Sequence, residues 1–340
     1  MTYSYSLYGL VLNSRVPIPG LAQGGSSPLH NPVEFFYRKG PAWALDALRK
    51  TSRLICSFPA DPAAPDPAFS VMEYGEQEFF QLRYSDGTQF IVDGSATSVW
   101  GECPADFSIE DLATYLLGPV MGFVLRLRGV TALHASAANV DGSAIILCGP
   151  AGAGKSTTVA ALALRGVPVL CEDISPIYER GGSFWVLPGY PRVCLWPDSI
   201  EKLFGTRDAL PRITPGWEKC FLPLDGDKAR FERALLPLSV IYLLKPRSPD
   251  IRGALIEAVQ SPEAVFELVR NTYMNRLLNK QQRAVEFDLL SRLPASVVFR
   301  SITPGRDGAN LGVLCDAILE DASPLVSRGR KGAGALSLQS

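Results

Sequence analysis

Alternating hydrophobic and polar positions in the first hundred residues predict β-strands. The strand-like runs are Tyr3–Leu12, Phe35–Tyr37, Arg53–Phe58 and Phe79–Val92, the last interrupted by Ser85-Asp86-Gly87. Aromatic and β-branched runs on both sides of an Asp-Gly turn are typical of a hairpin. The four prolines between positions 59 and 67 predict a surface loop. We therefore expect residues 1–105 to form a β-rich N-terminal domain.

A mainly apolar run follows and predicts a helix over Ile109–Arg128. Its most apolar part, Leu112–Leu125, is too short to span a bilayer and contains Gly118-Pro119. We expect it to be a buried helix that connects the two domains, over residues 106–130.

After residue 130 the pattern changes to short apolar strands alternating with helices. Thr131–Val140 and Ser143–Cys148 flank an Asp-Gly turn and predict a second hairpin. Further strands are expected at 167–171, around 179–182, at 238–244 and at 296–301, and helices at 157–165, 261–293 and 310–320. This order predicts an α/β domain over 131–322, followed by a disordered tail over 323–340.

The second hairpin leads directly into a phosphate-binding loop, or P-loop. Residues 149–156 read Gly-Pro-Ala-Gly-Ala-Gly-Lys-Ser, which matches the pattern G-x-x-x-x-G-K-[ST] between a strand and a helix. Glycines let backbone N–H groups turn toward a polyphosphate, and the helix N-terminus adds partial positive charge. Lys155 is expected to reach the phosphates of ATP, and the Ser156 hydroxyl to bind Mg²⁺. The predicted nucleotide-binding residues are Gly149, Pro150, Ala151, Gly152, Ala153, Gly154, Lys155, Ser156 and Thr157.

Two acids end the next predicted strand, where phosphoryl transfer requires a metal ligand and a proton acceptor. We call Glu172 and Asp173 the acid pair. One carboxylate would hold Mg²⁺ and the other would accept the proton of an acceptor hydroxyl. Because adjacent carboxylates titrate together, the sequence leaves the two roles unassigned. The alternative is a polar loop or a helix cap without function.

Three further residues are candidates for the site. His134 lies on the hairpin strand before the loop and could contact the γ-phosphate or position an acid. Arg192 follows the turn Pro188-Gly189-Tyr190-Pro191 and could bind a substrate anion. Asp198 is a further candidate metal ligand. Each also fits a purely structural role, as a core histidine, a surface arginine or a surface acid.

Composition narrows the function classes. A net charge of −1 over 340 residues gives no reason to expect binding to nucleic acid or to a membrane surface. The seven cysteines are isolated, and the chain starts without a basic and apolar leader, so we expect a reduced, cytoplasmic protein. Only two histidines are present, which argues against a histidine-built zinc site. Whether the chain forms a homo-oligomer is left open.

The His134 hairpin, the phosphate loop and the acid pair together resemble the catalytic core of the HPr kinase/phosphorylase family. Segments 188–192, 196–198 and 203–205 resemble a branch of that family found with lasso-peptide biosynthesis, whose members are understood to phosphorylate the terminal serine of a precursor peptide. The resemblance covers residues 125–320, with Glu172-Asp173 where the family usually has two aspartates. It implies an HPr kinase-like P-loop domain, ATP and Mg²⁺ as cofactors, and a peptide or small protein with an acceptor serine as partner. It also implies catalytic roles for Asp173, Glu172, His134 and Lys155.

The favoured interpretation is an ATP-dependent serine kinase. One alternative is a nucleotide-driven ATPase or maturation protein that phosphorylates no acceptor, and another is a small-metabolite kinase. The sequence contains neither an Asn-Lys-x-Asp guanine-reading motif nor a Leu-Ser-Gly-Gly-Gln transporter signature, which argues against GTPase and transport functions.

Overall fold

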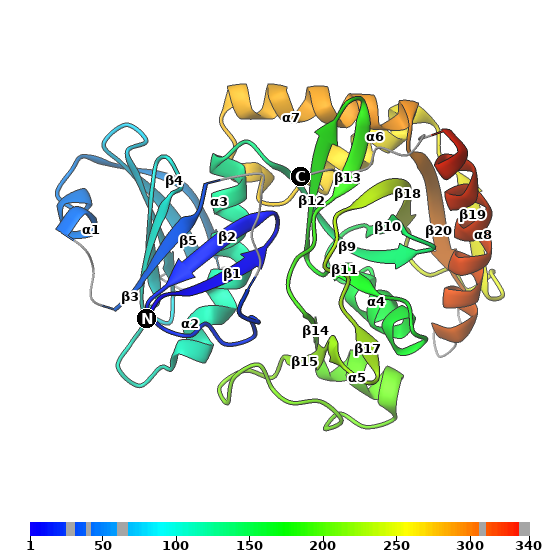
Figure 1. The fold of residues 1–340 in the computed structure, drawn as a ribbon, viewed down its shortest axis with the longest axis horizontal. Helices are drawn as coiled ribbons and strands as arrows, with labels where there is room; N and C mark the ends of the chain where they lie inside the picture. The colour runs from blue at the N-terminus through cyan, green and yellow to red at the C-terminus, as the bar shows by residue number, and fades with distance from the viewer. Residues whose placement is uncertain (25–30, 39–41, 60–66, 306–310, 333–340) are drawn as a thin grey trace. The chain divides into compact units, whose positions relative to one another are not determined.

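The computed structural model of the chain describes residues 1–24, 31–38, 42–59, 67–305 and 311–332 (Figure 1). The chain divides into two compact units. Unit 1 comprises Met1–Val130, Ile213–Gly216 and Met274–Arg283, and unit 2 comprises Thr131–Arg212, Trp217–Tyr273 and Ala284–Ser340. The predicted connecting helix therefore belongs to unit 1, as do two short stretches of the predicted kinase domain.

Unit 1 is built on an eight-stranded sheet with the order β1-β2-β3-β8-β7-β6-β5-β4. Its strands are β1 (Tyr3–Leu7), β2 (Leu10–Ser14), β3 (Val33–Tyr37), β4 (Ser52–Pro59), β5 (Pro67–Tyr74), β6 (Phe79–Tyr84), β7 (Gln89–Asp93) and β8 (Ser98–Glu102), with a short helix α1 (Ala42–Ala47) after β3. The hairpin predicted over 79–92 is present as β6 and β7. The single strand predicted over Tyr3–Leu12 is wrong: Tyr8 and Gly9 have φ of 56° and 74° and reverse the chain between β1 and β2. Of the predicted proline loop, 60–66 lie outside the described residues.

The helix predicted over 109–128 is present with a change of winding in its middle. It consists of α2 (Ile109–Tyr115), a π-helical turn η1 (Leu116–Val120) and α3 (Met121–Leu127). Pro119 lies inside the π turn, and because proline has no N–H it cannot donate an α-helical hydrogen bond there. The helix packs on the sheet of unit 1, where the rings of Phe123 and Phe80 meet edge to face at 5.2 Å. This is the buried helix that the apolar run predicts.

Unit 2 is mixed α/β and contains a central sheet with the order β11-β9-β10-β18-β20-β19. Its strands are β9 (Thr131–Val140), β10 (Ser143–Cys148), β11 (Val169–Cys171), β18 (Leu236–Leu244), β19 (Ala254–Ala258) and β20 (Val298–Pro304). The strands β10, β18 and β20 run parallel, and the other neighbours are antiparallel. A hairpin of β12 (Ile174–Arg180) and β13 (Ser183–Val186) pairs with the first residues of β9 and β18.

Helices cover both faces of this sheet (Figure 1). Along β10, Ile145 and Leu147 belong to a core shared with α4 (Lys155–Leu164) and α8 (Leu311–Gly332), whereas Ile146 and Cys148 face the core shared with α6 (Ser261–Arg270) and α7 (Lys280–Arg292). The alternation follows from the two-residue period of a strand. All six residues of β10 are buried, so the strand that leads into the phosphate loop is held on both faces.

Two helix predictions are wrong in extent. The helix predicted over 261–293 is interrupted between α6 and α7 by a 3₁₀ turn, Asn275–Leu277, before which Met274 has φ of 52°. The disordered tail predicted from residue 323 instead continues α8 to Gly332, and 333–340 lie outside the described residues. The reason is burial, because Ala322 and Val326 extend the apolar face of α8 and are fully buried. Within the described ranges, no helix has both the length and the apolar character needed to cross a bilayer.

Candidate active site

The hairpin of β9 and β10 positions the phosphate loop. Asp141 and Gly142 at its tip have φ of 48° and 76°, as a two-residue type I′ turn requires. The Asn139 side chain accepts a hydrogen bond from the Gly142 amide at 2.7 Å and fixes this turn. The strand β10 then runs between β9 and β18 and ends at Cys148. The loop is therefore anchored by a strand that is paired on both sides.

The phosphate loop has the backbone that its glycines predict. Gly152 and Gly154 have φ of 78° and 97°, and α4 begins directly after Gly154. A Cβ atom on either glycine would meet no atom within 4 Å, so these positions need glycine for its φ and not for space. At Gly149 space is limiting instead, since a Cβ atom would lie 3.0 Å from the Leu244 carbonyl oxygen. The loop places its amides at the N-terminus of α4, where an anion binds most favourably.

Lys155 is the first residue of α4 and is only 6% exposed. Its ammonium donates hydrogen bonds to the carbonyl oxygens of Gly149 and Pro150, at 2.8 and 3.0 Å. Burial lowers the pKa of Lys155, against the opposite effect of nearby Cys148 and the acid pair. The ammonium therefore lies within the loop, where a polyphosphate would replace the two carbonyl contacts.

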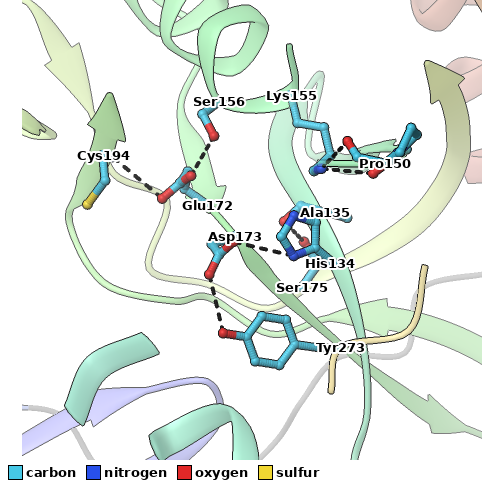
Figure 2. Close-up of polar contacts among 11 residues, drawn as sticks. His134, Ala135, Pro150, Lys155, Ser156, Glu172, Asp173, Ser175, Cys194 and Tyr273 are labelled. Atoms are coloured by element: carbon cyan, nitrogen blue, oxygen red, sulfur yellow. Dashed lines mark hydrogen bonds and ion pairs between the residues drawn. The ribbon is translucent and has the colours of Figure 1, made fainter. Parts of the chain in front are cut away.

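The acid pair occupies a tight turn between β11 and β12. The Ile174 amide donates to the Glu172 carbonyl at 2.8 Å, and Asp173 between them has φ of 68°. This pattern is that of a γ-turn, and a non-glycine residue at such a φ costs about 1–3 kcal/mol. Successive side chains of a straight strand would point to opposite faces. Because the chain turns here, the side chain of Glu172 points to Ser156 of the phosphate loop, and the side chain of Asp173 points to His134 of β9 (Figure 2).

Glu172 is the buried member of the pair, 7% exposed. Its Oε1 accepts a hydrogen bond of 2.6 Å from the Ser156 hydroxyl, and its Oε2 accepts a longer one, 3.5 Å, from the Cys194 amide (Figure 2). Burial raises the pKa of Glu172 above its usual value and Asp173 adds to the rise, while Lys219 and these hydrogen bonds act against it. Glu172 thus joins the acid pair to the phosphate loop.

Asp173 is the more open member, with 36% of its side chain exposed. Its Oδ1 lies 3.5 Å from His134 Nδ1, and its Oδ2 accepts a hydrogen bond of 3.4 Å from the Tyr273 hydroxyl. The ring of His134 stacks on that of Tyr273 at 6.0 Å, and its backbone amide donates to the Asn271 carbonyl at 2.7 Å. Burial lowers the pKa of His134, more than Asp173 raises it. A neutral His134 can donate its Nδ1 proton to Asp173 and hold that carboxylate in place.

Lys219 is a further residue whose charge acts on the acid pair. It precedes β15 (Cys220–Pro223), which pairs with β14 (Arg192–Leu195), and its ammonium lies 5.8 Å from the centroid of the Trp196 ring. Burial alone would lower the pKa of Lys219, but the acid pair and the Cys194 thiol raise it above its usual value. Lys219 therefore supplies a second cation to the acid pair. The sequence around it contains no motif that would have marked it.

Arg192 and Asp198 have different surroundings from each other. Arg192 is 7% exposed, and its guanidinium lies over the rings of Tyr190 and Phe221, at 5.0 and 5.9 Å. Asp198, in contrast, is exposed near the start of α5 (Pro197–Phe204) and forms an ion pair with Arg207. The Thr157 hydroxyl contacts the Ser199 hydroxyl of α5 at 2.8 Å, so this helix adjoins the phosphate loop. The structure brings Glu172 and Ser156 together and pairs Asp198 with a surface arginine.

The donor set fits Mg²⁺ bound together with a nucleotide. Among the described residues, no group of three or more His, Cys, Asp and Glu side chains is arranged to hold a metal ion. Mg²⁺ is usually held by one or two carboxylates with substrate phosphates and water, so a complete protein cage is not required. The adjoining oxygens of Ser156 and Glu172 are hard ligands of the kind it prefers.

No family model matches the chain, and no curated protein matches it either. Among solved structures, the chain is similar to the Hpr(Ser) kinase/phosphatase from Coxiella burnetii, with 13% identity over 61% of this chain and 99% of that chain, and a TM-score of 0.31. A superposition at this TM-score does not establish a common fold.

Proposed function

We propose that unit 2 is an ATP-dependent kinase that transfers the γ-phosphoryl group to a serine hydroxyl of a peptide or small protein. The observation that carries this proposal is the hydrogen bond between Ser156 and Glu172, which joins a phosphate-binding loop to an acid pair. A phosphate cradle, a metal ligand set and a proton acceptor are the parts that phosphoryl transfer requires. These three parts come from the phosphate loop, the turn that contains the acid pair, and the hairpin of β9 and β10.

The phosphate loop would bind the phosphates of ATP through its backbone amides and the Lys155 ammonium. The ammonium already lies within the loop, on the Gly149 and Pro150 carbonyls, so a short side-chain movement would bring it to the β- and γ-phosphates. Electrostatic stabilisation by donors that are fixed in advance is a major source of rate enhancement in such reactions.

Ser156 and Glu172 would hold Mg²⁺. When bound, this ion would neutralise negative charge on the phosphates of ATP. Burial of Glu172 raises its pKa in the absence of a cation. A cation beside this carboxylate would favour its charged form, so metal binding and the ionisation of Glu172 would support each other.

Asp173 would accept the proton of the acceptor hydroxyl. It is the more exposed acid, and His134 and Tyr273 orient its two oxygens. The serine oxygen would attack the γ-phosphorus as the bond to the β-phosphate oxygen breaks, and ADP would leave as the hydroxyl proton moves to Asp173. In this assignment Glu172 is the metal partner and Asp173 is the proton acceptor.

The acceptor that we propose is the C-terminal serine of a lasso-peptide precursor. The support is the resemblance of segments 188–192, 196–198 and 203–205 to that branch of the HPr kinase/phosphorylase family. In this chain the first of these segments contains Arg192, whose guanidinium is a candidate to bind an anionic group of the acceptor.

Intact-mass analysis of peptides incubated with the protein and Mg-ATP tests the proposal. A serine-terminated peptide is compared with the same peptide ending in alanine, using wild type, Lys155→Ala and Asp173→Asn. We expect a phosphate to be added to the serine peptide by wild type alone. ATP consumption without a mass change on any serine peptide would contradict the proposal and favour the ATPase alternative.

A further inference from the structure

The two-stranded ribbon of β14 and β15 has one face in the core and one face outside it. Its inner face belongs to the hydrophobic core that includes α4, through Val193, Leu195, Cys220 and Leu222. Because side chains alternate along a strand, Cys194 lies on the opposite face, together with the two residues that continue the ribbon, Trp196 and Lys219. We call this face, with Cys194, Trp196 and Lys219, the outer face.

Trp196 and Lys219 are partners across the end of the ribbon. Leu195 pairs with Cys220, so the next position on one strand is Trp196 and the next on the other is Lys219. The backbone of Trp196 is still extended, with φ of −78° and ψ of 154°. The Lys219 ammonium accordingly lies 5.8 Å from the centroid of the Trp196 ring. The ring and the cation therefore form one unit of the outer face.

The outer face adjoins the acid pair. The Cys194 amide donates to Glu172 Oε2 at 3.5 Å. Burial acts to lower the pKa of Lys219, but the acid pair and the Cys194 thiol raise it, so the ammonium lies near both carboxylates. The strand β14 and the helix α5, which begins directly after Trp196, lie beside α4 (Figure 1). The indole is thus placed next to the groups that act on the γ-phosphate and the acceptor.

Trp196 exposes a large apolar surface in this place. Its side chain is 57% exposed, whereas Leu195 before it is 1% exposed and packs in the core. The mechanism proposed above does not use the ring. Tryptophan is the residue type most enriched among those that dominate the binding energy of interfaces. An exposed indole beside a reaction centre is therefore a candidate contact for the substrate.

Charge and position limit what the ring binds. A cationic side chain would meet the Lys219 ammonium, which already lies on the ring, and like charges repel at this range. The base of ATP lies at the opposite end of the triphosphate from the γ-phosphate, whereas the ring lies beside the acid pair. A neutral, apolar side chain of the acceptor suits this surface best.

We propose that Trp196 binds a large apolar side chain located one or two residues before the acceptor serine. The proposal rests on the proposed function, because it takes Asp173 as the place where the serine hydroxyl reacts. Neighbouring Cα atoms of a peptide are about 3.8 Å apart, so side chains this near to the serine reach a ring beside the acid pair. The substrate class is then a peptide with an aromatic or aliphatic residue directly before its serine.

Calorimetric titration of the full chain with peptides, in the presence of Mg²⁺ and a non-hydrolysable ATP analogue, tests the proposal. The peptides end in serine and are identical except at the two positions before it, each of which carries Phe, Ala, Lys or Asp in turn. We expect Phe at one of these positions to give binding about tenfold tighter than Ala, and Lys to give weaker binding than Ala. Trp196→Ala should abolish the preference for Phe.

Two further variants make the test specific. Trp196→Phe keeps an aromatic ring and should keep part of the preference. Phe266→Ala removes another exposed aromatic side chain of unit 2, which also lies near a cation, the Arg270 guanidinium at 5.5 Å, and should leave the preference unchanged. A displaced Lys219 in Trp196→Ala would alter the affinity of all peptides alike. The ratio of Phe to Ala affinity therefore reports on the ring itself.

The same preference for Phe in wild type and Trp196→Ala, or no preference in wild type, would overturn the proposal. Weaker binding of the ATP analogue to Trp196→Ala, with the peptide preference retained, would also overturn it, because the ring would then stack on the base. Tightest binding of the Asp peptides, lost in Lys219→Gln, would do so as well, because Lys219 would then select the peptide by charge.

Phosphoryl transfer is measured on the same peptides with Mg-ATP, so that the two proposals are tested separately. A preference for Phe that Trp196→Ala abolishes, without phosphorylation of any peptide, would contradict the kinase function and support recognition by Trp196. Phosphorylation of all peptides with equal affinity would support the kinase function and overturn recognition by Trp196.

Discussion

The Ser156 hydroxyl lies 2.6 Å from Glu172 Oε1, so the first turn of the phosphate-loop helix is bonded to the acid that directly follows β11. Ser156 is expected to bind a metal ion, and its hydroxyl donates to Glu172. The same turn directs Asp173 to His134. Because Glu172 and Asp173 have different contacts, their separate roles can be tested by substitution.

Replacing Asp173 by Asn should remove catalysis and preserve the fold. Asparagine tolerates a φ of 68° about as well as aspartate, so the turn should remain intact. Loss of the proton acceptor should lower the rate of phosphoryl transfer about 10²–10⁴-fold. The measurement is single-turnover phosphorylation of a serine peptide, with nucleotide affinity and thermal unfolding as controls. Asp173→Ala should in addition be less stable than Asp173→Asn, because alanine tolerates a positive φ less well than asparagine does. Equal stability of the two variants would argue against a strained turn.

Replacing Glu172 by Gln should make the nucleotide-free protein more stable at neutral pH and less active. The folded-state pKa of Glu172 is raised above its usual value of 4.5, chiefly by burial. For an acid with a raised pKa, the stability contribution is present below the unfolded pKa and is lost as pH rises through the folded pKa. The free energy of unfolding of wild type should therefore fall relative to that of Glu172→Gln as pH rises above 4.5. Urea unfolding across this range measures the difference, and parallel curves would show that Glu172 is not perturbed.

His134 should act by orienting Asp173, with a characteristic pH dependence. Burial lowers its folded-state pKa below the usual value of 6.5. A histidine with a lowered pKa contributes stability above its unfolded pKa, and this contribution is lost as pH falls through the folded pKa. His134→Asn keeps a donor near the position of Nδ1, whereas His134→Ala removes it. We expect His134→Asn to retain more activity than His134→Ala, and both to lose less stability than wild type as pH falls below 6.5. Equal activity of the two variants would contradict an orienting role.

Lys219 should keep Glu172 ionised. Its ammonium counteracts the rise in the pKa of Glu172, so Lys219→Gln should move the acid limb of the pH–rate profile to higher pH. The maximal rate should fall about tenfold or more, because the acid pair loses a neighbouring cation. Lys228→Gln, at an exposed position of unit 2, is the matched control. An unshifted pH–rate profile in Lys219→Gln would show that Lys219 does not act on the acid pair.

The phosphate loop and its hairpin could be predicted because their signals are local. Asp141-Gly142 specifies the turn, and Gly152 and Gly154 adopt the φ values that only glycine reaches without strain. The turn between β1 and β2 also has a local signal in Gly9, which the alternating pattern around it obscured.

Other features depend on contacts between distant segments and could not be predicted. Lys219 approaches the acid pair only because β15 pairs with β14. Met274 has a φ that methionine rarely adopts, so nothing in the sequence marks the break between α6 and α7. At α8, the apolar spacing of Ile318, Ala322 and Val326 was present, but the Gly, Ser and Arg residues after it suggested disorder.

The most direct test of the central claim follows the γ-phosphate of radiolabelled ATP. The label is partitioned between a serine-terminated peptide and free phosphate, in wild type and in Asp173→Asn. A kinase that uses Asp173 as its proton acceptor should transfer most of the label to the peptide, and Asp173→Asn should bind ATP and transfer almost none. Label recovered only as free phosphate, at a rate that neither the peptide nor Asp173→Asn changes, would contradict the account.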